Sequence, residues 1–244
     1  MDTRFLFFSV FPLSLRFPIA IAIGDIHGCL QPLRLLVERL PAGETLVFLG
    51  DYVDRGPQSA GVLRYLRRLA RERPCRFLKG NHEDLMLETI AHPEAIELWL
   101  INGGGATLAS YGLELREWLR APDRGEFLGP DREFLESLEL YVEDERTIFV
   151  HAGIDLREPD MARQNPRILL WIREPFFRSA NAWHGKEIIF GHTPTLSMGL
   201  PDGEIFRSRA LIGIDTGCVY GGVLTAIDSR THALYQERSD FRYR

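Results

Sequence analysis

Five short apolar stretches of this chain are each followed, within a few residues, by side chains that can bind a metal ion. The stretches are residues 19–23, 45–49, 75–78, 147–150 and 187–190. They are rich in Ile, Val, Leu and Phe, as buried strands are. The segments that follow them read GDIHG, GDYVDRG, GNHE, HAG and GHT. Because the carboxyl ends of parallel strands lie along one edge of a sheet, we expect these polar residues to meet there.

The segments between the first three stretches have the pattern of amphipathic helices. Residues 30–40 and 61–71 place apolar side chains on one stripe and charged side chains opposite. Strands that alternate with such helices form βαβ units, so we expect an α/β fold. Residues 83–140 are mainly helical in pattern, whereas short strand-like runs separated by Gly, Asp and Ser return after residue 205.

No repeat, linker or low-complexity segment divides the chain, so we expect one domain over residues 18–244. Residues 1–17 are expected to be an N-terminal extension. Its apolar run, residues 5–15, is interrupted by Pro12 and is shorter than a membrane span. A signal-peptide cleavage site near Ala20 would remove the first core strand. We therefore expect no membrane anchor.

Composition narrows the function classes. The chain carries 29 Lys and Arg against 34 Asp and Glu, a net charge of −5, which argues against a nucleic-acid-binding protein because phosphate backbones attract basic surfaces. The three cysteines form no CxxC pair and no even set. This is typical of a reducing compartment, and we expect a cytoplasmic protein.

The residues at the strand ends suit a metal centre. They offer carboxylate, amide and imidazole ligands and no thiolate, a set that favours manganese, iron or zinc over calcium. A single ion rarely takes six protein ligands and keeps an open position, so two ions bridged by one carboxylate are expected. The candidate ligands are Asp25, His27, Asp51, Asn81, His151 and His192.

In order and spacing, the segments GDIHG, GDYVDRG and GNHE and the two later histidines resemble the metallophosphoesterase superfamily. Within it they are most similar to the Ser/Thr phosphoprotein phosphatase branch, in its bacterial and phage-type members. The resemblance covers residues 19–228 and includes the segments ELWLINGGG, LWIRE, FGHTP and IDTGCVYGG. It implies a metallophosphoesterase fold: a central β-sandwich flanked by helices in four layers, αββα, with a helical insert. That insert, residues 84–146, carries no recognisable motif, and we interpret its glycines 103–105 as a helix-ending turn.

The same resemblance implies how the metal ligands divide. Asp25, His27 and Asp51 would hold one ion. The other would be held by the bridging Asp51 together with residues contributed by three further segments, namely Asn81, His151 and His192. Manganese is the expected metal, with iron or zinc as alternatives.

The resemblance also implies the catalytic groups. His82 would be the general acid that protonates the leaving oxygen, and Asp54 would orient its imidazole. Arg55, Arg173 and Asn81 would bind the substrate phosphate, and a guanidinium fork suits two phosphate oxygens. Lys79 stands where eukaryotic members commonly have Arg, a change that conserves charge.

The function so implied is a two-metal phosphomonoesterase. A metal-bridging hydroxide would attack phosphoserine, phosphothreonine or phosphotyrosine of a protein in line, and small phosphoesters are alternative substrates. The long C-terminal region with which eukaryotic members contact regulatory subunits has no counterpart here. No regulatory partner is therefore expected.

Three alternatives remain open. A symmetrical dinucleoside tetraphosphate hydrolase shares the first two motifs, but that group tends to have Asp where this chain has Glu83. A phosphodiesterase or nuclease would usually carry a second histidine where Pro194 stands. A binding module without catalysis would be expected to have lost a ligand or the acid, and none is missing.

Overall fold

The structure, a computed structural model, describes residues 20–243. The prediction for the extension, residues 1–17, therefore lies outside the described residues. Two five-stranded sheets form the centre of the molecule, in the orders β10-β9-β1-β2-β3 and β4-β5-β6-β8-β7. The strands are β1 Ala20–Ile23, β2 Thr45–Phe48, β3 Cys75–Phe77, β4 Tyr141–Glu143, β5 Thr147–Val150, β6 Glu187–Phe190, β7 Phe206–Ser208, β8 Leu211–Gly213, β9 Val223–Asp228 and β10 Leu234–Arg238.

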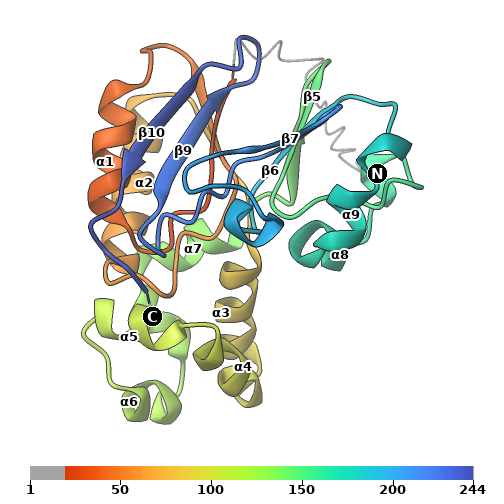
Figure 1. The fold of residues 1–244 in the computed structure, drawn as a ribbon. Coiled ribbons are helices and arrows are strands. Elements are labelled where there is room, and N and C mark those ends of the chain that lie inside the picture. The colour runs from red at the N-terminus through yellow and green to blue at the C-terminus, as the bar shows by residue number, and fades with distance from the viewer. Residues whose placement is uncertain (1–19, 244) are drawn as a thin grey trace, which may run out of the picture.

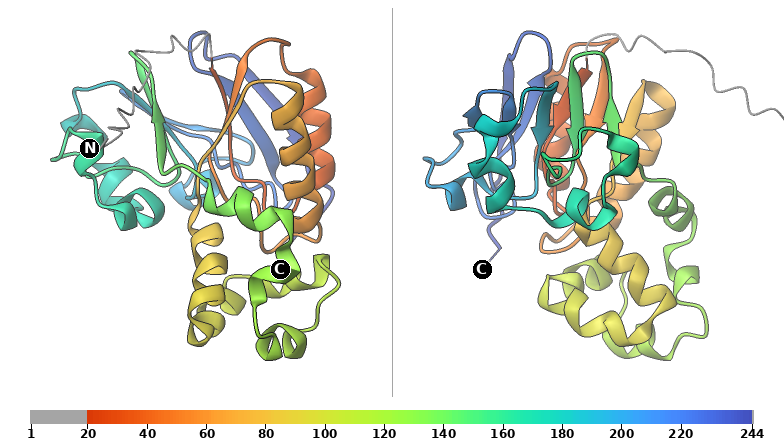
Figure 2. Two further views of the ribbon diagram at one scale, coloured as in Figure 1. Left: turned by 180° about the vertical axis from the view of Figure 1, so that it is seen from behind. Right: turned by 90° about the vertical axis from the view of Figure 1, so that its right-hand side faces the viewer.

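Helices cover the outer face of each sheet, and a further group of helices extends from one end (Figure 1, Figure 2). The α-helices are α1 Leu30–Arg39, α2 Ser59–Glu72, α3 Asn81–Ala91, α4 Ile96–Ile101, α5 Gly104–Ser110, α6 Leu115–Arg120, α7 Pro130–Glu136, α8 Pro166–Trp171 and α9 Glu174–Arg178. Short 3₁₀ turns are η1 Pro93–Ala95, η2 Arg124–Leu128, η3 Met161–Arg163, η4 Ala180–Ala182 and η5 Thr195–Met198.

The predicted βαβ units are confirmed. Strands β1, β2 and β3 are parallel neighbours, connected through α1 and α2, and β5, β6 and β8 form the parallel part of the second sheet. The antiparallel strands β4, β7, β9 and β10 lie toward the edges of the two sheets. The loops that follow the carboxyl ends of the parallel strands therefore lie in one region of the molecule.

Side chains of each central strand alternate between two apolar layers. In β1, Ile21 and Ile23 pack with the helical layer of α1 and α2, whereas Ala20 and Ala22 pack between the sheets. In β5, Phe149 enters the layer between the sheets, and its neighbours face the layer of α8 and α9. Strands buried on both faces read as continuous apolar runs, which is why the sequence revealed them. The four-layer αββα arrangement is confirmed.

The helical insert differs from the sequence prediction in one respect. Residues 141–143 were included in the insert, but they form β4, which pairs antiparallel with β5. The remaining insert is helical, and α3 to α6 extend beyond the sandwich at the end where the parallel strands finish (Figure 1). Gly103 adopts a φ of +102° between α4 and α5, as expected for a turn that ends a helix. Among residues 20–243, no helix has the length and apolarity that a membrane span requires.

Candidate dinuclear metal centre

The six candidate ligands converge where the parallel strands of both sheets end. Each follows its strand within four residues, and Asn81, which follows β3, is also the first residue of α3. All six are buried, with exposed fractions of 0–4%. They are Asp25 and His27 after β1, Asp51 after β2, Asn81, His151 after β5 and His192 after β6. The structure therefore brings together residues that lie up to 167 positions apart.

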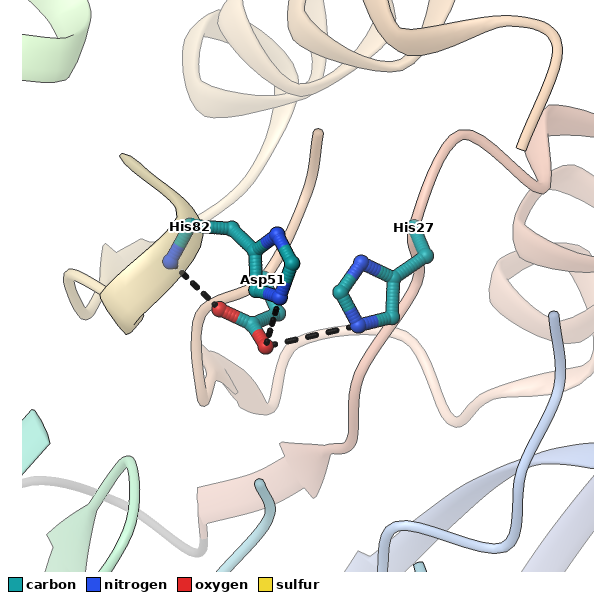
Figure 3. Close-up of side chains that lie close together, drawn as sticks. All are labelled: His27, Asp51 and His82. Atoms are coloured by element: carbon teal, nitrogen blue, oxygen red, sulfur yellow. Dashed lines mark hydrogen bonds and ion pairs between the residues drawn. The ribbon is translucent and has the colours of Figure 1, made fainter. Parts of the chain in front are cut away.

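Asp51 lies at the middle of this group. Its Oδ2 is 3.3 Å from Nε2 of His27 and 3.9 Å from Nε2 of His82, and its Oδ1 is 3.4 Å from Nε2 of His151. Figure 3 shows His27 and His82 on either side of this carboxylate. Two groups of potential ligand atoms thus share Asp51, and within each group the atoms lie within 4.8 Å of one another. They are His27, Asp51 and His82, and Asp51, His151 and His192.

In His27 and His151, one ring nitrogen makes a hydrogen bond to a backbone carbonyl and the other faces Asp51. Nδ1 of His27 lies 2.8 Å from the carbonyl oxygen of Val53, and Nδ1 of His151 lies 2.9 Å from that of Leu49. A carbonyl accepts only a donated proton, so both rings carry their proton on Nδ1. Nε2 is then a lone-pair donor, the arrangement typical of metal-binding histidines.

His192 shows most directly that these side chains suit a metal ion. Both of its ring nitrogens are buried, and neither has a hydrogen-bond partner among the described residues. Burial, the neighbouring His151 and Arg173 hold the pKa of His192 well below its usual value, and burial and Arg55 lower the pKa of His27 to about 3. Neutral imidazoles are what a cation requires. The residues present therefore fit a metal centre with oxygen and nitrogen ligands.

Asp25 and Asn81 border the two groups. Nε2 of His151 lies 3.0 Å from Oδ1 of Asn81, so these two potential ligands face each other. Both carboxylate oxygens of Asp25 accept a hydrogen bond from the backbone amide of His192, at 3.0 Å each. Burial, Asp215 and Asp51 raise the pKa of Asp25 well above its usual value. A divalent cation would relieve this repulsion between buried carboxylates.

His82 and Asp54 form a buried pair beside the metal ligands. Nδ1 of His82 lies 2.7 Å from Oδ2 of Asp54, and its Nε2 is buried without a hydrogen-bond partner among the described residues. Burial disfavours the charged imidazole, but Asp51 and Asp54 outweigh it and raise the pKa of His82 above its usual value. His82 is thus prepared to carry a proton on the nitrogen that faces the centre.

The two predicted phosphate-binding arginines also reach this region. Nη1 of Arg55 lies 2.7 Å from Nε2 of His27, and its guanidinium carbon is 5.7 Å from the ring centroid of Tyr220. Nη1 of Arg173 donates to the carbonyl oxygen of His192 at 3.1 Å and to Oγ1 of Thr193 at 3.3 Å. Both positive charges therefore lie next to the carboxylates and histidines, where a phosphate would need them.

Backbone strain is concentrated at the same place. Of the seven non-glycine residues in the described chain with positive φ, five belong to the predicted site. They are His27, Asp51, Asp54, Arg55 and His192. Such conformations cost of order 1–3 kcal/mol each and persist only where surrounding contacts impose them. The fold therefore holds these side chains in positions that the isolated loops would not adopt.

Glu83 was present in a motif, but the sequence did not indicate its structural role. Its Oε2 accepts hydrogen bonds from the backbone amides of Asp51 and Gly80, both at 2.9 Å. Its Oε1 accepts from the amides of Tyr52 at 2.7 Å and Val53 at 3.1 Å. One buried carboxylate thus accepts hydrogen bonds from three amides of the loop that carries Asp51 and from the amide of Gly80 before α3. Only the pattern GNHE pointed to it.

Three further residues near the centre were not identified from the sequence. Trp99 and Thr107, both from the insert, donate hydrogen bonds to Asp54. Asp215 follows β8 and is 5% exposed, and burial raises its pKa to about 6. The position of Asp215 after an apolar strand is the same signal that pointed to the candidate ligands. Trp99 and Thr107 gave no such signal, because nothing in a helical pattern shows what an indole contacts.

The approach of Gly80 to Asp51 leads to a testable prediction. A Cβ at position 80 would collide with Oδ1 and the backbone nitrogen of Asp51. We expect Gly80→Ala to displace this carboxylate, lower the free energy of unfolding by about 1–3 kcal/mol and weaken metal binding. Titration calorimetry with manganese and urea unfolding would measure both. Gly105→Ala is the control, because no atom lies within 4 Å of that Cβ and the residue is inside α5, where alanine is favoured by about 0.5–1 kcal/mol. Unchanged manganese binding in Gly80→Ala would contradict the prediction.

Comparisons with known proteins agree on the family. The model of the family described as calcineurin-like phosphoesterase matches residues 20–209. An asymmetrical bis(5'-nucleosyl)-tetraphosphatase of Halalkalibacterium halodurans is 28% identical over 239 residues, which cover 84% of this chain and 87% of that protein. A symmetrical bis(5'-nucleosyl)-tetraphosphatase of Ectopseudomonas mendocina is 27% identical over 285 residues, and the alignment covers 88% of this chain and 96% of that protein. The crystal structure of a putative diadenosine tetraphosphatase has the same fold, with a TM-score of 0.65, 23% identity and coverage of 93% of this chain and 96% of that one.

These comparisons correct the substrate prediction. A phosphoprotein was expected, but the relatives that span most of the chain are named as tetraphosphatases, so the prediction of a protein phosphatase is wrong. The motifs could not separate the two classes, because metal ligands, acid and arginines all act on a phosphoryl group that both substrates contain. Glu83 was used as the distinguishing residue, yet its oxygens contact backbone amides. Its identity therefore reports on the loop and not on the substrate.

The assignment to a family does not depend on the substrate prediction. The matched region, residues 20–209, covers well over half of the chain and contains every predicted ligand. The buried histidine and aspartate groups that share Asp51 are those that a metal-dependent phosphoesterase requires. This chain belongs to the calcineurin-like phosphoesterase family and is a metallophosphoesterase hydrolase.

Proposed function

We propose that this protein hydrolyses dinucleoside tetraphosphates in a two-metal reaction. The observation that carries the proposal is that relatives named as tetraphosphatases, of the symmetrical and the asymmetrical kind, align over 84–88% of the chain. Alignments of this length extend well beyond the short motifs that contain the proposed ligands. The substrate and the position of cleavage are both parts of this proposal.

The proposed metal ligands are those that the family resemblance implied. Asp25, His27 and Asp51 would hold one ion, and Asp51, Asn81, His151 and His192 would hold the other. The shared role of Asp51 is supported by its membership of both groups of ligand atoms, one with His27 and the other with His151 and His192. When bound, two divalent ions would supply an activated water and neutralise phosphate charge. Manganese is the proposed metal, and iron and zinc also suit the ligand set.

The proposed roles of the other residues concern the substrate. Arg55 and Arg173 would bind the oxygens of the phosphate under attack and stabilise the charge that it gains, with Asn81 as a further contact. His82 would donate its Nε2 proton to the leaving oxygen, and Asp54 would keep the ring aligned. The 2.7 Å contact between His82 and Asp54 and the unpartnered Nε2 support this assignment.

A substrate comparison tests the proposal. With manganese, the protein is expected to release nucleotides from diadenosine tetraphosphate, and to do so with a kcat/KM roughly 10²-fold or more above that for a phosphoserine peptide. Product analysis distinguishes the cleavage positions, since two ADP molecules indicate symmetrical cleavage and ATP with AMP indicates asymmetrical cleavage. Protein stripped of metal by a chelator is the control and should be inactive until manganese is returned. A higher kcat/KM for the phosphopeptide would refute the substrate proposal.

Domain organisation and location are proposed on separate grounds. We propose that residues 18–244 form one domain, because a shared apolar layer joins the two sheets. A cytoplasmic location is proposed from the free thiols of Cys29, Cys75 and Cys218. Limited proteolysis of the purified protein and fractionation of the cells that produce it would test the two statements.

A further inference from the structure

The carboxylate of Asp54 is the meeting point of hydrogen bonds from two parts of the molecule. Its Oδ2 faces Nδ1 of His82 at 2.7 Å. From the helical insert, Nε1 of Trp99 on α4 lies 3.0 Å from both carboxylate oxygens, and Oγ1 of Thr107 on α5 donates to Oδ1 at 2.6 Å. Asp54, Trp99 and Thr107 are 0% exposed. No water therefore competes for these bonds.

Thr107 also holds the backbone of Asp54. The amide of Asp54 donates to Oγ1 of Thr107 at 2.8 Å and to Oγ of Ser59 at 3.1 Å. Asp54 has a φ of +70°, which is unfavourable for a residue with a side chain. A single hydroxyl group thus receives a hydrogen bond from the main chain of Asp54 and donates one to its side chain. This arrangement fixes both ends of the residue.

The next residue is held by the same part of the insert. The amide of Arg55 donates to the carbonyl oxygen of Gly103 at 3.2 Å, and a Cβ at position 103 would lie 2.8 Å from Cγ of Arg55. The turn between α4 and α5 therefore packs directly on the loop that carries Asp54 and Arg55. The insert contacts the proposed catalytic residues as well as extending away from them (Figure 1).

We propose that Trp99 and Thr107 are positioning residues, which hold the carboxylate of Asp54 so that His82 is aligned for proton donation. The proposal rests on the role assigned to His82 under the proposed function. Without the indole N–H and the hydroxyl, the carboxylate would be free to rotate about its Cβ–Cγ bond, and Oδ2 would leave the line of the imidazole. Fixed orientation of an acid by neighbours that never touch the substrate is a recurring source of catalytic rate.

Trp118 provides a matched control for Trp99. The two indole rings are neighbours, with centroids 5.5 Å apart, and both are 0% exposed. Nε1 of Trp118 has no hydrogen-bond partner among the described residues, whereas Nε1 of Trp99 contacts Asp54. Replacing either by phenylalanine removes an indole N–H and a similar volume from one apolar cluster. Only Trp99→Phe removes a contact with Asp54.

With phenyl phosphate as the substrate, we expect Trp99→Phe to lower kcat by about 10- to 100-fold, with KM changed less than about threefold. Trp118→Phe should leave both within about twofold, because it removes a donor that is already unsatisfied. Manganese affinity, measured by calorimetry, should be the same in both variants, since neither residue contacts a proposed ligand. Equal losses of kcat in the two variants would show that the cluster acts only through packing, and would overturn the proposal.

The leaving group gives a second readout, which packing alone would not change. Any phosphate ester that the wild-type protein hydrolyses can serve, so this test does not depend on the tetraphosphate substrate. The loss in Trp99→Phe should be about tenfold or more for phenyl phosphate, whose leaving oxygen needs a proton. It should be within about threefold for p-nitrophenyl phosphate, whose leaving group is stable without one. An equal loss on both esters would contradict a role through His82.

Thr107 tests the same proposal without changing an aromatic residue. Thr107→Val removes the hydroxyl, and Thr107→Ser keeps it. With phenyl phosphate as the substrate, we expect Thr107→Val to lower kcat by about 10-fold or more and Thr107→Ser to keep kcat within about threefold of the wild type. In the metal-free protein, the NMR signal of the His82 Nδ1 proton should shift in Thr107→Val and Trp99→Phe and return to its wild-type position in Thr107→Ser. A wild-type signal in all three variants would overturn the proposal whatever the true substrate is.

Discussion

Asp51→Asn is expected to reduce kcat/KM by roughly 10³-fold or more, about 4 kcal/mol of transition-state stabilisation. The reason is that Asp51 belongs to both groups of potential ligand atoms. Its carboxylate oxygens lie 3.3 Å from Nε2 of His27 and 3.4 Å from Nε2 of His151. Asparagine keeps the shape but removes the negative charge and one of the two oxygen ligands.

Metal content separates this effect from general damage. Elemental analysis after dialysis against manganese is expected to find fewer ions bound to Asp51→Asn than to the wild type. Asp84→Asn is the control, because Asp84 lies on α3 close to the centre, has a side chain that is 48% exposed and pairs only loosely with Lys79, at 3.9 Å. It should keep full metal content and kcat/KM within about twofold. Full activity in Asp51→Asn would refute the bridging role.

Glu83→Gln is expected to cause the largest loss of stability. The substitution conserves shape, but its amide group would point N–H bonds at two of the four backbone amides that now donate to Glu83. Each buried donor left without an acceptor costs about 1–3 kcal/mol, so we expect the free energy of unfolding to fall by roughly 2–5 kcal/mol. This is a large share of the 5–15 kcal/mol typical of a domain. Urea unfolding of metal-free protein measures it without a contribution from bound ions.

Glu88→Gln is the control for this measurement. Glu88 lies on the same helix, its side chain is 57% exposed, and it has only a loose pairing with His92. Its change should be within about 0.5 kcal/mol. A decrease of less than 1 kcal/mol in Glu83→Gln would mean that other acceptors satisfy the loop. Glu83→Asp adds a functional check: because both oxygens face backbone amides, the ratio of kcat/KM between diadenosine tetraphosphate and a phosphopeptide should not change.

Much of the fold was visible in the sequence because its strands are buried on both faces. Such strands read as unbroken apolar runs, and β1, β2, β5 and β6 were found within one residue of their limits. β4 was missed. It is an edge strand of three residues, Tyr141–Glu143, next to a helical region, and only its pairing with β5 makes it a strand. Local sequence carries little information about a partner that is distant in the chain.

The convergence of the candidate ligands was predictable for a related reason. A parallel strand ends at a known edge of its sheet, so a polar residue just after the apolar run is placed by the fold itself. Asp25, Asp51, His151 and His192 all follow this rule. Asp215 obeys it too and lies in the segment IDTGCVYGG, but the sequence analysis assigned it no role. The substrate prediction failed because it relied on Glu83 to distinguish the two substrate classes, and the sequence does not show what Glu83 contacts.

By itself, the sequence determined the α/β class, the family and the residues that surround the metal centre, because strand ends and short motifs are local properties. Tertiary structure alone decided which groups hold those residues in place. Glu83 accepts hydrogen bonds from three amides of the loop of Asp51 and from the amide of Gly80. Trp99 and Thr107 reach Asp54 from an insert about fifty residues further along the chain. Positive φ at five site residues likewise depends on the surrounding contacts. Hydrogen bonds between distant segments depend on how helices pack, and that packing cannot be read from either segment alone.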